Sequence, residues 1–205
     1  ILEFVIENNG KNEFEEFKKA KPEDLTRNEI KVNILSSGCW PLIRQRPFNI
    51  IANKDEIPRD IFITSFNSAP LAPDFDTIIR NEFSVFQTGI NALKKLTDGK
   101  IYLGIKAGEL STPFTNTANV EKYEFKGPHP AGNVGIQINK IKPVNKGEIV
   151  WTLNATDVLI IGRLFETGKY DPSKIIAVSG SEIKNPKYYK TISGANIGEI
   201  VKDKI

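Results

Sequence analysis

Few side chains in the sequence have the chemistry of a nucleophile or of a general acid–base pair. His129 is the single histidine and stands between two prolines. A histidine-based proton transfer would have to use it, but we favour a structural or capping role. Cys39 is the single cysteine, and Arg44 and Arg46 follow it closely. Arginines can lower the pKa of a thiol, yet an inert buried thiol is the interpretation we favour.

Metal and phosphate chemistry have little support in the sequence. One cysteine and one histidine exclude a Cys/His zinc site and a cluster held by several thiolates of this chain. The Gly132–Gly135 segment stands where a helix is expected to begin, so its N–H groups could hold an anion; a tight turn is the alternative. Asp74 and Asp76 are interpreted as helix-capping residues. Asp60 is interpreted as a solvated turn residue.

Cationic and aromatic residues offer two further hypotheses. The Arg44-Gln45-Arg46 segment could bind phosphate or an acidic partner, because the guanidinium fork fits both. A salt-bridged loop explains it equally well. Trp40, Phe48 and Trp151 could line an apolar, quinone-like pocket, while core packing is the favoured interpretation.

Composition limits the classes of protein. The chain has 205 residues, 40% of them hydrophobic and 26% charged, so it should fold. A net charge of +3 is too small to indicate a nucleic-acid partner. The lone cysteine favours a reducing compartment, and no apolar run approaches the roughly 20 residues of a membrane helix. The first residues resemble a strand rather than a signal peptide. With no methionine, we expect a middle portion of a longer protein.

Hydrophobic periodicity predicts alternating strands and helices in the first part of the chain. A strand, a loop, a helix and a second strand in succession imply a parallel pair, and ligands of such sheets bind beyond the carboxyl ends of strands. The loop over 66–73 is therefore expected where a ligand or partner would bind. The expected elements are a strand over 2–7, a helix from the capping box at Thr26–Glu29 to about 37–38, an irregular stretch over 39–58, strands over 61–64, 101–105 and 120–125, a helix over 83–96 that stops at Gly99, and a helix from about Pro130.

The second part of the chain begins after a segment that resembles a linker, residues 142–147. We predict two domains, a Rossmann-like α/β domain over 1–141, whose first strand comes from a preceding domain, and a β-grasp domain over 142–205. The elements expected in the second are strands over 148–153, 174–179 and 187–192, a helix capped by Asn154 and closed by Gly168, and a last helix from Ala195 to Val201.

Several motifs together resemble the NqrA family, which provides one subunit of the Na⁺-translocating NADH:quinone oxidoreductase (Na⁺-NQR). They occur in the family's order along nearly the whole chain. They are Ser37–Trp40, Arg44-x-Arg46-Pro47-Phe48, Ile61–Ile63 with Asn67–Ala72, Gly127–Gly132, Trp151 with Asp157-Val158, Ile161–Gly168, Asn185-Pro186 and Gly194-Ala195.

The resemblance implies a soluble cytoplasmic subunit of a respiratory complex on the bacterial inner membrane. That complex oxidises NADH, reduces ubiquinone and exports Na⁺. The implied fold is a Rossmann-like domain similar to the flavin-binding subunit of complex I, followed by a β-grasp domain of the soluble-ligand-binding type. The implied partners are the other subunits, chiefly a membrane subunit.

The resemblance also bears on cofactors. In the complex I relatives a glycine-rich loop approaches the flavin phosphate, and residues 38–47 take that place here with bulky side chains. We therefore expect no redox cofactor on this chain and no catalysis by the chain alone, with FMN, FAD, 2Fe-2S and NADH in other subunits. A flavin- or nucleotide-binding electron-entry subunit and a free-standing ligand-binding module are the alternatives. Contact with ubiquinone or with another subunit is assigned to Trp40, Arg44, Arg46, Phe48, Leu71 and His129. The apolar and aromatic set among the loop residues is expected to converge at the strand ends, namely Trp40, Phe48, Phe66, Leu71 and His129. His129 is expected to hold the join of the two domains in shape.

Overall fold

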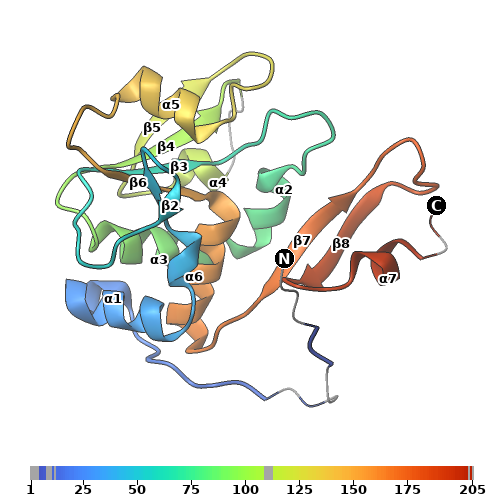
Figure 1. Ribbon diagram of the computed structural model, residues 1–205, viewed down its shortest axis with the longest axis horizontal. Helices are drawn as coiled ribbons and strands as arrows, with labels where there is room; N and C mark the ends of the chain where they lie inside the picture. Colours follow the sequence, from blue (N-terminus) through green and yellow to red (C-terminus); the bar gives the residue numbers. More distant parts are fainter. Residues whose placement is uncertain (1–4, 8–10, 12, 109–112, 203, 205) are drawn as a thin grey trace.

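A six-stranded mixed sheet forms the centre of the molecule in the computed structural model, which describes residues 5–7, 11, 13–108, 113–202 and 204 (Figure 1). The strand order is β2-β1-β6-β3-β4-β5. Strands β6, β3, β4 and β5 run parallel, and β1 joins β6 and β2 antiparallel. The strands are β1 (Arg44–Arg46), β2 (Ile50–Ile51), β3 (Ile61–Thr64), β4 (Ile101–Lys106), β5 (Glu121–Phe125) and β6 (Val150–Asn154).

Helices cover both faces of this sheet (Figure 1). Helix α5 (Val134–Ile141) lies on one face, where Ile138 packs with Phe62, Tyr102 and Val150. The other face carries the main core, which contains Phe86, Ile90 and Leu93 of α3 and Val158, Leu164 and Phe165 of α6. The remaining helices are α1 (Arg27–Ser36), α2 (Phe75–Ile79), α3 (Phe83–Lys94), α4 (Pro113–Asn116), α6 (Ala155–Thr167) and α7 (Ile197–Val201).

Local signals place these helices where the sequence predicts them. Thr26 and Glu29 form the predicted capping box, with the Thr26 N–H donating to Glu29 Oε2 at 2.9 Å. At the start of α6 the Asn154 N–H donates to Asp157 Oδ2 at 3.2 Å, and Gly168 ends that helix in the left-handed conformation at φ 73°. The α/β fold class with a parallel central pair, β3 and β4, is confirmed.

The boundary predicted between residues 141 and 142 needs correction. Strand β6 pairs in parallel with β3 along its length, and α6 packs against α3 in the main core. Both therefore complete the first domain. Only β7 (Ser173–Val178), β8 (Lys187–Ile192) and α7 follow it among the described residues, and the two strands form a separate antiparallel hairpin (Figure 1).

Four local expectations were also wrong. Residues 5–7 form no strand, and the rest of that predicted strand lies outside the described residues. The stretch predicted to be irregular contains a 3-10 helix (Trp40–Leu42) and strands β1 and β2. Helix α3 ends at Lys94 rather than at Gly99. Helix α5 begins at Val134, after Asn133, rather than near Pro130.

Candidate functional site

The candidate site lies beyond the carboxyl ends of the parallel strands. The chain leaves β3 for β4 through α2 and α3, whereas it leaves β5 through α5, crosses the opposite face and enters β6 on the other side of β3 (Figure 1). The strand order therefore reverses between β3 and β6. Open α/β sheets bind their ligands at such a switch point.

Two adjoining cavities open there. The first, which we call the aromatic cavity, has a volume of about 490 Å³, within the size range of ligand pockets. It lies over β3, β4 and β5. Its lining residues are Ser65, Phe66, Asn67, Ser68, Ala72, Pro73, Asp74, Phe75, Asp76, Lys106, Ala107, Phe114, Phe125, Lys126 and Gly127.

The second cavity, which we call the arginine cavity, has a volume of about 430 Å³ and shares Phe66, Asn67 and Phe75 with the first. It lies at the start of α5 over the ends of β3 and β6. Arg46 and the Gly132–Ile136 segment line it together with Thr64 and Asn154. The Gly132–Gly135 segment, which was considered as an anion site, and Arg46 therefore lie around the same cavity.

Two loops meet above these cavities and fix their shape. Ser68 Oγ accepts from the Gly132 N–H at 2.8 Å and lies 3.2 Å from His129 Nδ1. Thr64 Oγ1 donates to the Gly132 carbonyl at 3.0 Å. A Cβ at position 132 would lie 2.6 Å from the Ser68 N, so only glycine lets the two loops approach this closely.

Two buried polar atoms at the cavities have no hydrogen-bond partner among the described residues. They are Oδ1 of Asp76, a residue only 6% exposed, and Nε of Arg46. The other carboxylate oxygen of Asp76 pairs with Arg80. Buried polar groups are nearly always hydrogen-bonded, so these two atoms are exceptions among the residues around the cavities.

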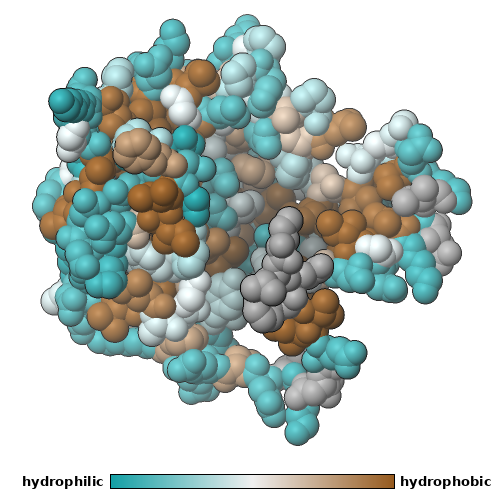
Figure 2. All heavy atoms as spheres, in the orientation of Figure 1, coloured by the Kyte–Doolittle hydropathy of each residue, from teal (hydrophilic) through white to brown (hydrophobic). Residues whose placement is uncertain are grey.

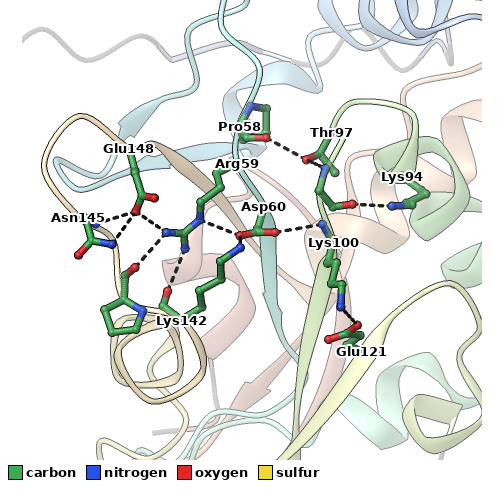
Figure 3. A network of polar contacts seen from close by, with 12 residues as sticks. Pro58, Arg59, Asp60, Lys94, Thr97, Lys100, Glu121, Lys142, Asn145 and Glu148 are labelled. Carbon is green, nitrogen blue, oxygen red and sulfur yellow. Dashed lines mark hydrogen bonds and ion pairs between the residues drawn. The ribbon is translucent and has the colours of Figure 1, made fainter.

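The amino ends of the same strands carry a different arrangement (Figure 3). Asp60 Oδ2 lies 2.8 Å from Arg59 Nε and 2.8 Å from Lys142 Nζ, and Asp60 Oδ1 accepts from the Lys100 N–H at 3.1 Å. Arg59 also pairs with Glu148. Asp60 is 1% exposed, so the interpretation of a solvated turn residue was wrong.

The surroundings of Asp60 decide its ionisation. Burial by itself raises the pKa of the carboxyl group. Hydrogen bonds from Lys142, from the Lys100 N–H and from Arg59 outweigh burial and hold the pKa of Asp60 below its ordinary value. The group is therefore an ionised carboxylate that ties β3 to the end of α5 and to β4. Two of these partners come from distant sequence positions, and one of them donates through its backbone, which explains why the sequence did not reveal the network.

The residues assigned to quinone or subunit contact do not converge. Trp40 is buried and packs edge-on against Trp151 with ring centroids 5.5 Å apart, as core packing predicted. Phe48 is 82% exposed in the turn between β1 and β2. Leu71, 70% exposed, and His129 lie in the loops at the carboxyl ends.

The other predicted residues have these positions. Arg44 is half-buried and donates to the Asn49 carbonyl. Leu71 has a φ of 61°, which costs a non-glycine residue about 1 kcal/mol or more. His129 contacts Ser68 of the loop after β3 rather than a join between domains. Burial raises the pKa of the Cys39 thiol, which agrees with an inert residue.

Asp76 is the site residue whose role the sequence did not reveal. Asp74 accepts from the Asp76 N–H at 3.0 Å, so the capping interpretation holds for Asp74. The Asp76 carboxylate instead pairs with Arg80, and the residue is one of those that line the aromatic cavity. The spacing of four residues between Asp76 and Arg80 was the one signal available, and such pairs usually lie on solvated helix faces.

Metal-ligating clusters and membrane-spanning helices are both absent from the part of the chain that the structure describes. No group of three or more His, Cys, Asp or Glu side chains is arranged there to hold a metal ion. None of the helices formed by these residues is long and apolar enough to cross a membrane.

Two family models match the chain, and relatives match it along nearly its whole length. A model described as "NqrA second alpha/beta domain" matches residues 25–170, and "NQRA C-terminal domain" matches residues 175–205. The chain is 35% identical over 200 residues to the NqrA subunit of the "Na(+)-translocating NADH-quinone reductase" of Pasteurella multocida (strain Pm70), covering 98% of this chain and 45% of the relative. It is 38% identical over 196 residues to the corresponding protein of Neisseria meningitidis serogroup B (strain ATCC BAA-335 / MC58), covering 96% of this chain and 44% of the relative.

Solved structures resemble the fold at low sequence identity. A crystal structure of an NAD⁺-reducing NiFe-hydrogenase in the air-oxidised state aligns with a TM-score of 0.65 and 12% identity, over 90% of this chain and 39% of that one. The H₂-reduced state aligns with a TM-score of 0.60. These alignments support the predicted Rossmann-like fold. The chain spans a little under half the length of the curated relatives it matches.

Proposed function

The chain belongs to the NqrA family of subunits of the Na⁺-translocating NADH-quinone reductases, and on that premise we propose that it is the central part of such a subunit. The assembled complex oxidises NADH, reduces ubiquinone and exports Na⁺. This subunit carries no redox cofactor of its own. It acts in assembly and in contact with quinone, at the cytoplasmic face of the membrane and beside a membrane subunit.

The absence of a flavin site is supported by how residues 38–47 are built. Cys39, Trp40 and Ile43 are all buried, and Trp40 Nε1 donates to the Ala52 carbonyl at 2.7 Å. The segment then continues as the antiparallel strand β1. A phosphate-binding loop instead exposes backbone N–H groups to its ligand. FMN, FAD, 2Fe-2S and NADH are accordingly assigned to other subunits.

Contacts with neighbouring subunits are supported by exposed apolar side chains. Phe48 and Leu71 project from loops, and Ile50 and Ile51 of the edge strand β2 are about half exposed. Hydrophobic side chains also gather over the β7–β8 hairpin (Figure 2). Exposed apolar side chains of this kind are typical of interaction sites. We assign subunit or quinone contact to Phe48, Leu71 and His129. Arg44 and Trp40 hold the segment that carries Phe48, through the Asn49 and Ala52 carbonyls, and Arg46 lines the arginine cavity.

The experiment is to purify the complex with and without this subunit, and the full-length subunit alone. Without the subunit, reduction of ubiquinone by NADH should fall by tenfold or more while NADH oxidation with an artificial electron acceptor persists. The full-length subunit alone should show no flavin absorbance, should not take up added FMN, and should bind the rest of the complex. Stoichiometric flavin would instead indicate an electron-entry subunit. Failure to bind the other subunits would indicate a free-standing ligand-binding module.

A further inference from the structure

We propose that Arg163 is a positioning residue that locks the β7–β8 hairpin onto the α/β domain, so that the subunit presents both parts to the remaining subunits as one rigid surface. Only the choice of partner, the remaining subunits, rests on the proposed function. One guanidinium group carries the inference, because it contacts the start of α3 on one side and the start of β7 on the other. The Arg163 side chain is only 11% exposed.

The guanidinium of Arg163 donates through all three of its nitrogen atoms. Nε donates to Glu82 Oε2 at 2.8 Å and Nη2 to Glu82 Oε1 at 2.6 Å, which forms a bidentate pair. Nη1 donates to the Ser173 carbonyl at 2.9 Å and to Ser173 Oγ at 3.0 Å, and it lies 3.4 Å from Asp171 Oδ2. Glu82 directly precedes α3, and Ser173 begins β7. Because the guanidinium is a rigid planar fork, it fixes the directions of all these partners.

The charge on this group is stable. Hydrogen bonds to Glu82 raise the pKa of Arg163, and they outweigh burial, which by itself would lower it. Removing one member of a largely buried ion pair leaves the other without compensation. The contact between the α/β domain and the hairpin should therefore depend strongly on this one side chain.

Apolar packing alone leaves the hairpin incompletely held. Tyr170 and Ile175 pack against the main core, and the Tyr188 hydroxyl of β8 accepts from the Asp74 N–H at 2.9 Å. A cavity of about 150 Å³ nevertheless lies between α2, α6 and the start of β7. Protein interiors are normally packed without such voids. The orientation of the hairpin is therefore set chiefly by the hydrogen bonds of Arg163.

The link between α6 and β7 is held on another side by the N-terminal segment. The Phe17 N–H donates to the Gly168 carbonyl at 2.7 Å, and Lys169 Nζ lies 3.7 Å from the centroid of the Phe14 ring. A Cβ at position 168 would lie 2.8 Å from the Phe17 carbonyl oxygen, so glycine permits this close approach. With the link fixed at its start, the hairpin can turn only if the contacts of Arg163 break.

A rigid junction matters because both parts carry exposed apolar side chains. Phe48 and Leu71 project from the α/β domain, and Ile192 of β8 is 51% exposed. Two contact surfaces on one rigid body bind a partner more tightly than the same surfaces joined flexibly, because less freedom is lost on association. Freeing the hairpin should therefore weaken association even though every contact residue is still present.

The experiment measures the orientation of the hairpin in the full-length subunit by pulsed electron paramagnetic resonance. Spin labels are attached to Asn139→Cys on α5 and to Lys184→Cys in the turn between β7 and β8, both at exposed positions. Cys39 is buried and should not take up the label. With Arg163 unchanged, the distance between the labels should have one narrow distribution. This measurement needs no partner and no substitution in the junction.

Arg163→Gln should broaden that distribution by about twofold or more, because the hairpin then samples several orientations. Association with the remaining subunits should weaken by about tenfold. Arg163→Lys keeps the charge but loses the planar fork, so it should give an intermediate width. Glu82→Gln releases the guanidinium from its support, and it should broaden the distribution in the same direction even if Arg163→Gln does not fold. Circular dichroism checks the folding of each variant.

Arg27→Gln is the matched control. Arg27 also joins two elements, through the Lys95 carbonyl at 2.8 Å and an ion pair with Asp98, but both partners belong to the α/β domain. This substitution should leave the width of the distribution and the association unchanged.

Several outcomes would overturn the inference. They are a broad distribution with Arg163 unchanged, a width that neither Arg163→Gln nor Glu82→Gln alters, and equal effects of Arg27→Gln. Unchanged association despite a broadened distribution also overturns it, because rigidity would then serve no contact. The proposed function fails separately, if the unaltered subunit does not bind the remaining subunits, and the distance measurement stays interpretable in that case.

Discussion

The two ends of the parallel strands differ in how completely their polar groups are satisfied. At the amino ends, Asp60 is buried and both of its oxygens have partners (Figure 3). At the carboxyl ends, Asp76 is also buried and belongs to the residues that line the aromatic cavity, yet one of its oxygens has no partner among the described residues. Both groups are aspartates. Asp60 directly precedes β3, and Asp76 lies in helix α2, which follows β3 along the chain.

This contrast indicates which substitutions should mainly change the stability of the fold. A buried charge with a full set of partners stabilises the fold, because removing it leaves its partners uncompensated. A buried acceptor without a partner costs stability and persists where function retains it. We therefore expect substitution of the buried, fully paired carboxylate at the amino ends to change mainly the free energy of unfolding. At the carboxyl ends, substitutions that keep the two loops together should affect stability less.

The largest stability effect is expected for Asp60→Asn. It removes the charge that Arg59 and Lys142 share, and the free energy of unfolding should fall by about 3 kcal/mol. Asp55→Asn is the control, because Asp55 is exposed and its ion pair is with the neighbouring Lys54, and it should change stability by less than about 0.5 kcal/mol. Urea denaturation measures both. Equal losses of stability for the two substitutions would contradict a special contribution of the amino-end network.

The next largest effect is expected for Gly132→Ala. The added Cβ would meet backbone atoms of the 66–73 loop, so the loops must separate and stability should fall by about 1–3 kcal/mol. Gly135→Ala is the matched control, because no atom lies within 4 Å of the added Cβ. In helix α5 it should be neutral or stabilising by up to about 1 kcal/mol. A larger loss for Gly135→Ala would mean that the loops do not meet as described.

Acid should weaken the amino-end network only at a pH below the ordinary pKa of an aspartate. Because the pKa of Asp60 in the folded protein is held below its ordinary value of 3.8, its contribution is present above that value. It is lost as the pH falls through the folded pKa. Denaturation curves measured at falling pH should show wild type approaching Asp60→Asn. A difference between the two proteins that stays constant below pH 3.8 would contradict this assignment.

The smallest stability effect is expected for Phe48→Ala. Its ring is 82% exposed, so the free energy of unfolding should change by less than about 0.5 kcal/mol. Association of the full-length subunit with the remaining subunits should nevertheless weaken. Val32→Ala on helix α1 is the control, with a side chain 52% exposed and no assigned contact. If both substitutions weaken assembly equally, Phe48 has no special part in it.

The sequence alone was sufficient to predict those features that depend on residues close together in the chain. The capping box at Thr26–Glu29 begins α1, the apolar residues between 83 and 93 form one buried side of α3, and the short apolar run over 61–64 is a buried strand. Helix periodicity, capping and burial of a continuous apolar run are local signals. They were sufficient for the α/β class and for placing a loop at the carboxyl end of β3.

Which distant segments meet became clear only from the folded chain. The linker-like segment over 142–147 suggested a domain boundary, but β6 beyond it completes the sheet beside β3. Asp60 was interpreted as a turn residue, but the fold brings Lys142 and Lys100 to it. Asp76 lies in the first turn of α2, but the sequence did not show that one of its oxygens is buried without a partner among the described residues. Burial and partners across a sheet depend on contacts between residues far apart in sequence, which residue type and spacing do not encode.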